Sequence, residues 1–304
     1  MNNQYAADET KRAILRHKKI KPGKPITIGT SNFPQGSERQ YIHTVNEYYG
    51  ILRDLMQEYY PKIIESYKEA RDEDVKEKRN DSLTGGIDIT LMKLFSDMKN
   101  KLIQREESYQ LETGIRKAGE SAKAYSVRQW KQAIHQSLAI NIREDYYMGD
   151  FFKENLDKWV SDNVNLIVTM PGQSLDKMKD KVLSDFEKGK RSTDMAKDLQ
   201  RLYSIDKRHA KFIARDQTAK LNGQITRAQQ KDAGINKYVW RTSLDERVRP
   251  SHAELEGEIC DWDDPPMNSD GRACHPGEDF NCRCTAEAVI DLDSISLPID
   301  DSDD

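Results

Sequence analysis

Apolar residues along the first two thirds of the chain recur mostly at steps of three and four positions, the period of an amphipathic helix. The clearest seam begins near Ser37 and predicts a helix packed against another helix. Its apolar positions are Ile42, Val45, Tyr49, Leu52, Met56, Tyr59 and Ile63. Pro61 lies within the seam and is expected to kink the helix or split it in two. Because the seam lasts only about three heptads, we favour one element of an antiparallel bundle over an intermolecular coiled coil.

The same period continues beyond this seam and predicts several further helices. We expect a break at Pro171-Gly172, and we expect Ser192 and Asp206 to begin two successive helices as N-caps. Everything from residue 37 to Gly234 is therefore predicted to be helical or to connect helices. The predicted helices after the first are 89–111, 118–142, 150–168, 175–186, 195–203 and one from Asp206 towards Gly234.

The pattern changes after Gly234. β-prone residues predict short strands at 238–240, 255–262 and 285–290, with a loop rich in Pro, Gly, Asp and Asn between them. The predicted fold is mainly α: a long helical N-terminal region followed by a small α+β C-terminal domain with a Cys/His-rich loop. The predicted divisions are a flexible basic arm at 1–36, a helical region at 37–189, a C-terminal domain at 190–290 and an acidic disordered tail at 291–304.

Composition and charge limit what the chain can do. Hydrophobic residues make up 36% and charged residues 33%, so the core must be thin and drawn from helical stripes. A net charge of -4 implies no global affinity for polyanions. The two ends differ, because residues 11–24 carry no acid and residues 291–304 carry no base. Such ends are more often solvated than binding, yet the basic arm is the candidate DNA-binding segment, through Lys11, Arg12, Arg16, Lys18, Lys19, Lys21 and Lys24.

Export and membrane insertion are not expected. No N-terminal segment combines a basic start, an apolar run and a small-residue cleavage site. No apolar stretch approaches the roughly 20 residues that span a bilayer. We therefore expect synthesis in a reducing cytosol, where clustered cysteines favour a metal over disulfides.

All four cysteines gather in the predicted C-terminal loop, together with two histidines: Cys260, Cys274, Cys282, Cys284, His252 and His275. Cys282 and Cys284 are two positions apart and would point to the same side of an extended segment. A closed, structural zinc site is the preferred interpretation, with the four cysteines as ligands and either histidine able to replace one. Unligated thiols and disulfides stay open, because the spacing matches no standard zinc finger.

A second interpretation assigns chemistry to the turn at 245–252. His252 could act as a general base while Arg247 or Arg249 holds a phosphate, as in a metal-dependent nuclease. We favour a simpler role in which the Asp and Arg side chains of this turn hydrogen-bond the loop backbone. No Gly-rich phosphate loop or paired carboxylates stand out. A plain DNA-binding factor that uses residues 11–24 is the third alternative.

Several blocks in the last third of the chain resemble the phage head morphogenesis proteins, the minor head (minor capsid) proteins that include the F protein of phage Mu. The blocks follow the family's order across about residues 190–290. The block from His275 to Cys284 matches the family at His275, Pro276, Cys282, Arg283 and Cys284. The other blocks are 210–222, 230–235, 240–245, 249–252, 256–257 and 263–266. The resemblance brings no established catalytic residues.

The resemblance implies a virion component present in few copies and associated with the portal protein in head morphogenesis. We expect a protein made in the host cytoplasm and located in the head interior or at the portal vertex, without enzymatic activity. Scaffolding protein, major capsid protein and packaged DNA are further candidate partners. For some members the resemblance also implies a role in how DNA is held or ejected. The heptad seam makes the helical N-terminal half our candidate for portal contact.

Overall fold

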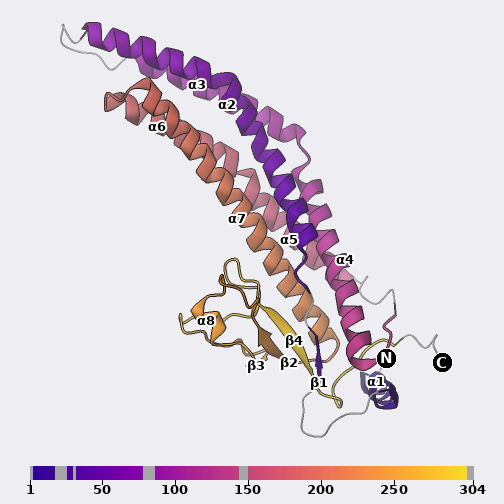
Figure 1. The fold of residues 1–304 in the computed structure, drawn as a ribbon. Helices are drawn as coiled ribbons and strands as arrows, with labels where there is room; N and C mark the ends of the chain where they lie inside the picture. The colour runs from indigo at the N-terminus through magenta and orange to yellow at the C-terminus, as the bar shows by residue number, and fades with distance from the viewer. Residues whose placement is uncertain (1–2, 18–25, 30–31, 78–85, 144–149, 300–304) are drawn as a thin grey trace. The chain divides into compact units, whose positions relative to one another are not determined.

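The computed structural model describes residues 3–17, 26–29, 32–77, 86–143 and 150–299. Its long elements are helices, and three of the four strands of a small sheet follow them along the chain (Figure 1), which confirms the predicted fold class. The helices are α1 (Asn3–His17), α2 (Gln35–Glu77), α3 (Gly86–Ser108), α4 (Leu111–Leu138), α5 (Asp150–Val168), α6 (Met170–Glu187), α7 (Ser192–Asp232) and α8 (Pro250–Ala253). The strands are β1 (Ile26–Ile28), β2 (Lys237–Arg241), β3 (Ile259–Asp261) and β4 (Thr285–Ile290).

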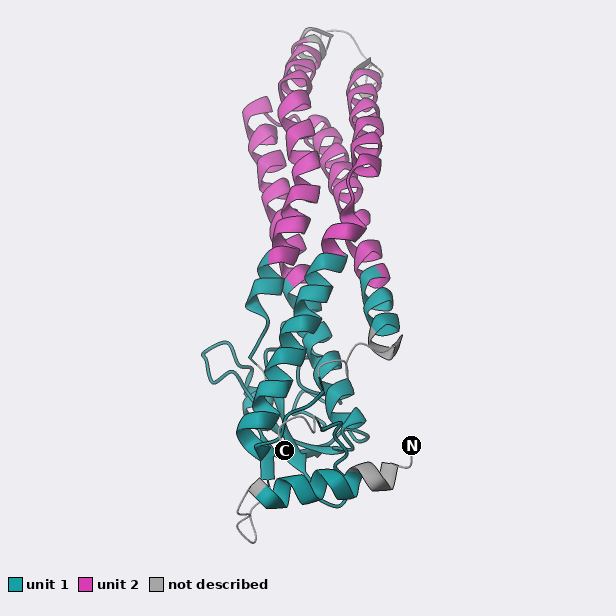
Figure 2. Cartoon of the chain, turned by 90° about the vertical axis from the view of Figure 1, so that its right-hand side faces the viewer, with its two compact units in different colours: residues 1–39, 116–160, 215–304 teal, residues 40–115, 161–214 magenta. Residues whose placement is uncertain are grey.

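The described residues divide into two compact units (Figure 2). Unit 1 comprises residues 1–39, 116–160 and 215–304, and unit 2 comprises residues 40–115 and 161–214. Each unit therefore collects stretches that are far apart in the sequence. The four-part division at residues 36, 189 and 290 stays a prediction about domains.

The sheet belongs to unit 1 and has the strand order β1-β4-β2-β3 with antiparallel pairing throughout. Buried and partly buried residues alternate along β4, as expected for a strand with one face in the core. Tyr238 pairs with Ala288 on one side and with Cys260 on the other. The predicted strands at β2 and β4 are confirmed, β3 is shorter than predicted, and β1 was missed.

Two buried clusters hold unit 1 together. In the first, Trp130 and Ile134 of α4 pack with residues of α1, the sheet and the C-terminal segment. The second lies on the sheet around Tyr238 and Trp240 and contains all four cysteines. Gln230 of α7 links helix and sheet, because its Nε2 donates to Ala286 O at 2.9 Å and its Oε1 accepts from Trp262 Nε1 at 2.9 Å. The cysteine-rich cluster is thus part of the packed sheet.

Unit 2 is a bundle in which buried tyrosines of α2 donate hydrogen bonds to α5 and to the connection between α6 and α7. Tyr41 donates to Asn163 Oδ1 at 2.7 Å, and Tyr67 donates to Lys190 O at 2.8 Å. The predicted seam of α2 is buried from Val45 to Ile63. Helix α2 is not split, since it continues through Pro61. The burial on either side of Pro61 outweighs the backbone hydrogen bond that proline removes.

Helix α7 corrects a second prediction, because the two helices expected after Ser192 form one. Asp206 lies inside α7 and does not cap a new helix. Its carboxylate accepts a hydrogen bond from Ser174 Oγ at 2.5 Å and pairs with Lys177 at 3.4 Å. Asp206 is only 9% exposed. Its role is therefore to join α6 to α7, and not to cap a helix. The break predicted at Pro171-Gly172 is also wrong: it lies at Thr169, one residue before α6, because Pro171 is tolerated in the first turn of α6.

The two ends of the chain also differ from expectation. Helix α1 lies in the predicted flexible arm, and residues 291–299 of the predicted disordered tail pack against it. Thr10 Oγ1 donates to Leu297 O at 3.2 Å and accepts from Leu297 N at 3.0 Å, beside the fully buried Ile14. Lys11 of the candidate DNA-binding set forms an ion pair with Asp293. Lys18, Lys19, Lys21 and Lys24 lie outside the described residues.

No helix among the described residues has the length and apolar character that crossing a bilayer requires.

Candidate metal centre

Strand β2 and helix α8 place one imidazole in the cysteine-rich cluster. Arg249 precedes Pro250 in an extended conformation, which the residue before a proline favours, and Pro250 begins α8. This turn brings His252 against Trp240, with ring centroids 5.5 Å apart in an edge-on arrangement. His252 is 2% exposed, so its imidazole belongs to the interior.

Two thiols approach this imidazole from the residues just before β4. Cys282 and Cys284 are two positions apart and reach His252 from the same side. Asn281, which precedes them, has a positive φ of 49°, a conformation that asparagine adopts more readily than most residues. Its N–H donates to Asp216 Oδ1 at 2.8 Å. The turn before the two cysteines is therefore fastened to α7.

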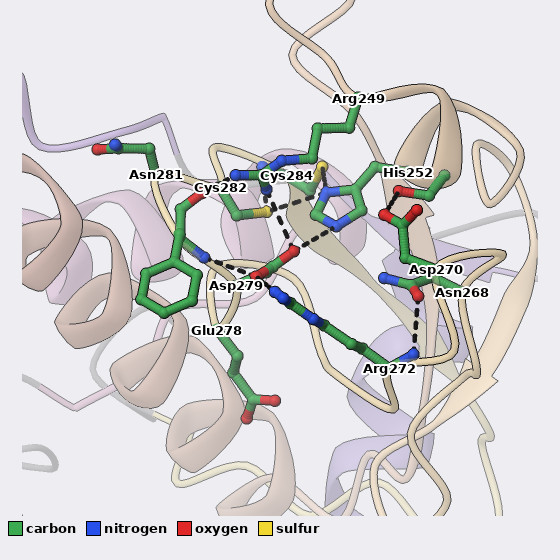
Figure 3. Close-up of polar contacts among 12 residues, drawn as sticks. Arg249, His252, Asn268, Asp270, Arg272, Glu278, Asp279, Asn281, Cys282 and Cys284 are labelled. Carbon is green, nitrogen blue, oxygen red and sulfur yellow. Dashed lines mark hydrogen bonds and ion pairs between the residues drawn. The ribbon is translucent and has the colours of Figure 1, made fainter.

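The three side chains form a compact donor group (Figure 3). His252 Nδ1 lies 3.5 Å from Cys282 Sγ and 3.6 Å from Cys284 Sγ. All three donor atoms lie within 4.8 Å of one another. A tetrahedral zinc ion with Zn–N of about 2.0–2.1 Å and Zn–S of about 2.3 Å requires N···S separations of about 3.6 Å. This group could therefore hold a metal ion.

The hydrogen bonds around the sulfur atoms favour a thiolate at Cys282. Its Sγ accepts the backbone N–H groups of Gly277 and Cys284, each at 3.4 Å. The Cys284 thiol, with His252 and these N–H groups, lowers the pKa of Cys282 against the opposing effect of burial. The hydrogen bond between Cys284 and Cys282, together with burial, raises the pKa of the Cys284 thiol. A cation would offset the repulsion between two thiolates, and metal ligation requires both cysteines to be deprotonated.

A buried carboxylate lies on the opposite side of the imidazole. Asp279 Oδ2 is 3.3 Å from His252 Nε2 and 3.2 Å from Arg249 Nη1. Asp279 Oδ1 accepts from Arg272 Nη1 at 3.0 Å and from the N–H of Phe280 at 2.8 Å. Burial alone would raise the pKa of Asp279, but these donors and charges outweigh it and lower the pKa. A carboxylate on the second ring nitrogen is the usual companion of a metal-binding histidine.

Cys260 and His275, two of the six predicted ligands, gather around Tyr238 and not around His252. Tyr238 and the His275 Nδ1 atom share a hydrogen bond of 2.9 Å, and the His275 ring lies 4.9 Å from that of Trp262. Cys260 pairs directly with Tyr238 across the sheet. Burial lowers the pKa of His275 and raises that of Cys260. Residues two positions apart on a strand are separated by about 7 Å, so the group around Tyr238 is distinct from the group around Trp240.

Cys274 is the remaining predicted ligand, and its buried side chain lies in the same cluster but outside the group of donor atoms that are within 4.8 Å of one another. Together with Cys282 it raises the pKa of His252 to about 10. Its N–H donates to Pro266 O at 3.3 Å, beside an isolated bridge between Met267 and Ala273. The Cys274 thiol is buried in the same cluster as Cys282 and Cys284.

Arg247 and Arg249, which the alternative nuclease interpretation assigns to phosphate binding, form hydrogen bonds and ion pairs within the loop. Arg247 Nη2 pairs with Asp245 at 3.2 Å, and Asp245 Oδ1 accepts the N–H of Arg247 at 3.0 Å. Arg249 donates to Phe280 O at 2.6 Å in addition to its contact with Asp279. These contacts agree with the interpretation that the Asp and Arg side chains fasten the loop.

Asp279 and Gly277 contribute to the centre but were not among its predicted residues. Asp279 lies within the His275–Cys284 block, but no sequence pattern pairs it with His252. Gly277 has a φ of +87°, and its N–H reaches Cys282 because the loop approaches α7 at Gly223. A Cβ atom on Gly223 would lie 2.8 Å from Pro276 O. Both contacts depend on the tertiary fold.

Comparison with known proteins bears on the same region. The family described as "Phage Mu protein F like protein" matches residues 176–287, which contain every residue of the centre. Residues 176–287 are therefore similar to the phage Mu F-like proteins. This Mu F-like region covers less than half of the chain and includes α7, the sheet strands β2 and β3, and the first half of β4.

One curated relative matches a stretch of this chain that is similar in length to the Mu F-like region. An uncharacterized protein of Haemophilus influenzae is 41% identical over 138 residues, which cover 45% of this chain and 30% of the relative. The matched part is thus less than a third of that relative's length. No solved structure matches the chain.

Proposed function

We propose that the protein is a minor head protein of a tailed phage, associated with the portal and acting in head morphogenesis. The observation that supports this proposal is the Mu F-like region, because the match to a family of phage proteins spans all residues of the His/Cys cluster. The family description concerns a phage protein, and virion localisation at the head interior or portal vertex follows as part of the same proposal. The portal protein is its principal proposed partner.

The helical bundle of unit 2 is the part proposed to contact the portal or other head proteins. Most of this unit lies outside the Mu F-like region, so the family match does not account for it. Its α3 carries the exposed apolar residues Ile89, Met92 and Ile103. Exposed apolar side chains on a helix provide area for a partner to bury.

A role in DNA packaging or ejection is a further part of the proposal, with residues 11–24 as the DNA-binding candidate. Within the described part of this segment, Lys11 is already paired with Asp293. DNA would therefore have to compete with the acidic C-terminal segment for this lysine. Salt-dependent DNA binding that is lost when residues 11–24 are deleted would support this role.

We also propose that the ion held by His252, Cys282 and Cys284 is zinc in a structural role. Two thiolates and an imidazole form a donor set that suits zinc, and the N···S distances match its tetrahedral geometry. The loop between β3 and β4 has little regular structure, so a metal would fix it where few apolar side chains do.

A pull-down with the portal protein, combined with mass spectrometry of mature heads, tests the assembly proposal. We expect the full chain to bind the portal and to be present in heads in few copies. Absence from heads and failure to bind the portal would refute the proposal. Cleavage of duplex DNA that is stopped by a chelator and lost in His252→Ala would favour a nuclease instead.

A further inference from the structure

The three donors His252, Cys282 and Cys284 leave one tetrahedral position to be filled. A catalytic zinc keeps that position for water or substrate, whereas a structural zinc fills it with a fourth protein ligand. The identity of the fourth ligand therefore decides what kind of site this is. The candidates within the cluster are Cys260, Cys274, His275 and solvent.

Solvent is disfavoured by the burial of the donor group. His252, Cys282 and Cys284 are 2%, 3% and 7% exposed, and Trp240 covers the imidazole with no exposed surface of its own. A water ligand that exchanges with substrate needs an open path to the ion. The burial of all three donors therefore disfavours water as the fourth ligand.

Cys260 and His275 are disfavoured as the fourth ligand because both lie beside Tyr238 of β2. Cys260 is the direct cross-strand partner of Tyr238, and His275 Nδ1 is engaged by the Tyr238 hydroxyl. His252 lies against Trp240, which is two residues further along the strand. A spacing of about 7 Å along the strand exceeds the roughly 4 Å between ligand atoms of one tetrahedral ion.

We infer that the centre is closed by Cys274, so that the ligands are Cys274, Cys282, Cys284 and Nδ1 of His252, with Asp279 holding the imidazole from Nε2. With solvent, Cys260 and His275 disfavoured, Cys274 is the remaining candidate, and it is buried in the same cluster as Cys282 and Cys284. Its neighbour His275 is already hydrogen-bonded to Tyr238. This inference rests on the proposed zinc.

X-ray absorption at the zinc edge of the wild-type full chain is the decisive measurement, because it needs no variant to fold. We expect a first shell of three sulfur atoms at about 2.3 Å and one nitrogen at about 2.0–2.1 Å. Two sulfur atoms with two light atoms would overturn the closure by Cys274 while leaving zinc in place. Absence of bound zinc would refute the zinc proposal itself, and closure by Cys274 with it.

Cobalt substitution of the full chain provides an independent count of thiolates. The thiolate-to-cobalt charge-transfer band should fall by about a third in Cys274→Ser, since one of three thiolates is removed. Cys260→Ser is the matched control, because it changes a buried cysteine of the same cluster and should leave the band unchanged. A band reduced by Cys260→Ser and unaffected by Cys274→Ser would overturn the inference.

Discussion

Replacement of Gly223 by alanine tests whether the close approach of the loop to α7 supports the metal centre. Alanine within a helix normally stabilises by about 0.5–1 kcal/mol relative to glycine. At Gly223, however, the new Cβ would lie 2.8 Å from the backbone oxygen of Pro276 and 3.6 Å from Gly277 Cα. Backbone atoms cannot rotate away as a side chain would, so the loop must shift, at an overpacking cost of about 1–3 kcal/mol. We expect a net loss of roughly 1 kcal/mol.

The same shift should weaken metal binding, because Gly277 N–H donates to Cys282 Sγ. Urea unfolding of the zinc-loaded chain and competition with a chelator measure the two effects. Gly50→Ala is the matched control: it lies inside α2, and its Cβ would meet only the flexible Arg53 side chain, at 3.5 Å. Gly50→Ala should stabilise. If Gly223→Ala stabilises as much and binds zinc as tightly as the wild type, the loop does not depend on this contact.

Three further changes have defined outcomes. Asp279→Asn should weaken zinc binding about 10–100-fold in a chelator competition, since the imidazole loses its charged partner, and unchanged affinity would contradict that role. Ile134→Ala removes a fully buried side chain and should lower the free energy of unfolding, measured in urea, by about 2–5 kcal/mol. Its control, Ile103→Ala at a half-exposed position, should change the free energy of unfolding by less than about 0.5 kcal/mol. Burial raises the pKa of Glu106 above 4.5, so the folded chain loses stability as pH rises from that value through the raised pKa. Glu106→Gln should therefore be more stable than the wild type at pH 7, with the difference shrinking below pH 4.5 in pH-dependent thermal unfolding.

Local patterns were sufficient to predict most of the elements. The steps of three and four from Val45 to Ile63 correspond to the buried face of α2, and the alternation in β4 corresponds to its burial. Gly234, with a φ of +71°, ends the helical part of the chain as its sequence position indicates. These features depend on residues close together in the sequence, so the sequence alone predicted them.

Local patterns failed where a distant residue changes the role of a side chain. Asp206 has the sequence signature of an N-cap, yet Ser174 and Lys177 of α6 engage its carboxylate and α7 continues. Helix α1 was missed because its single buried apolar face lies among many cations and becomes stable only against Leu297. In both cases packing supplies more free energy than the local preference.

For the metal centre, the sequence by itself determined the inventory of soft donors and the common direction of Cys282 and Cys284. Only the tertiary structure decided which donors meet. The antiparallel register places Cys260 at Tyr238, while the α8 turn places His252 at Trp240, where it reaches both thiols. The physical reason is distance: a metal bond extends little more than 2 Å, and positions that far apart in sequence acquire such proximity only through strand pairing and packing.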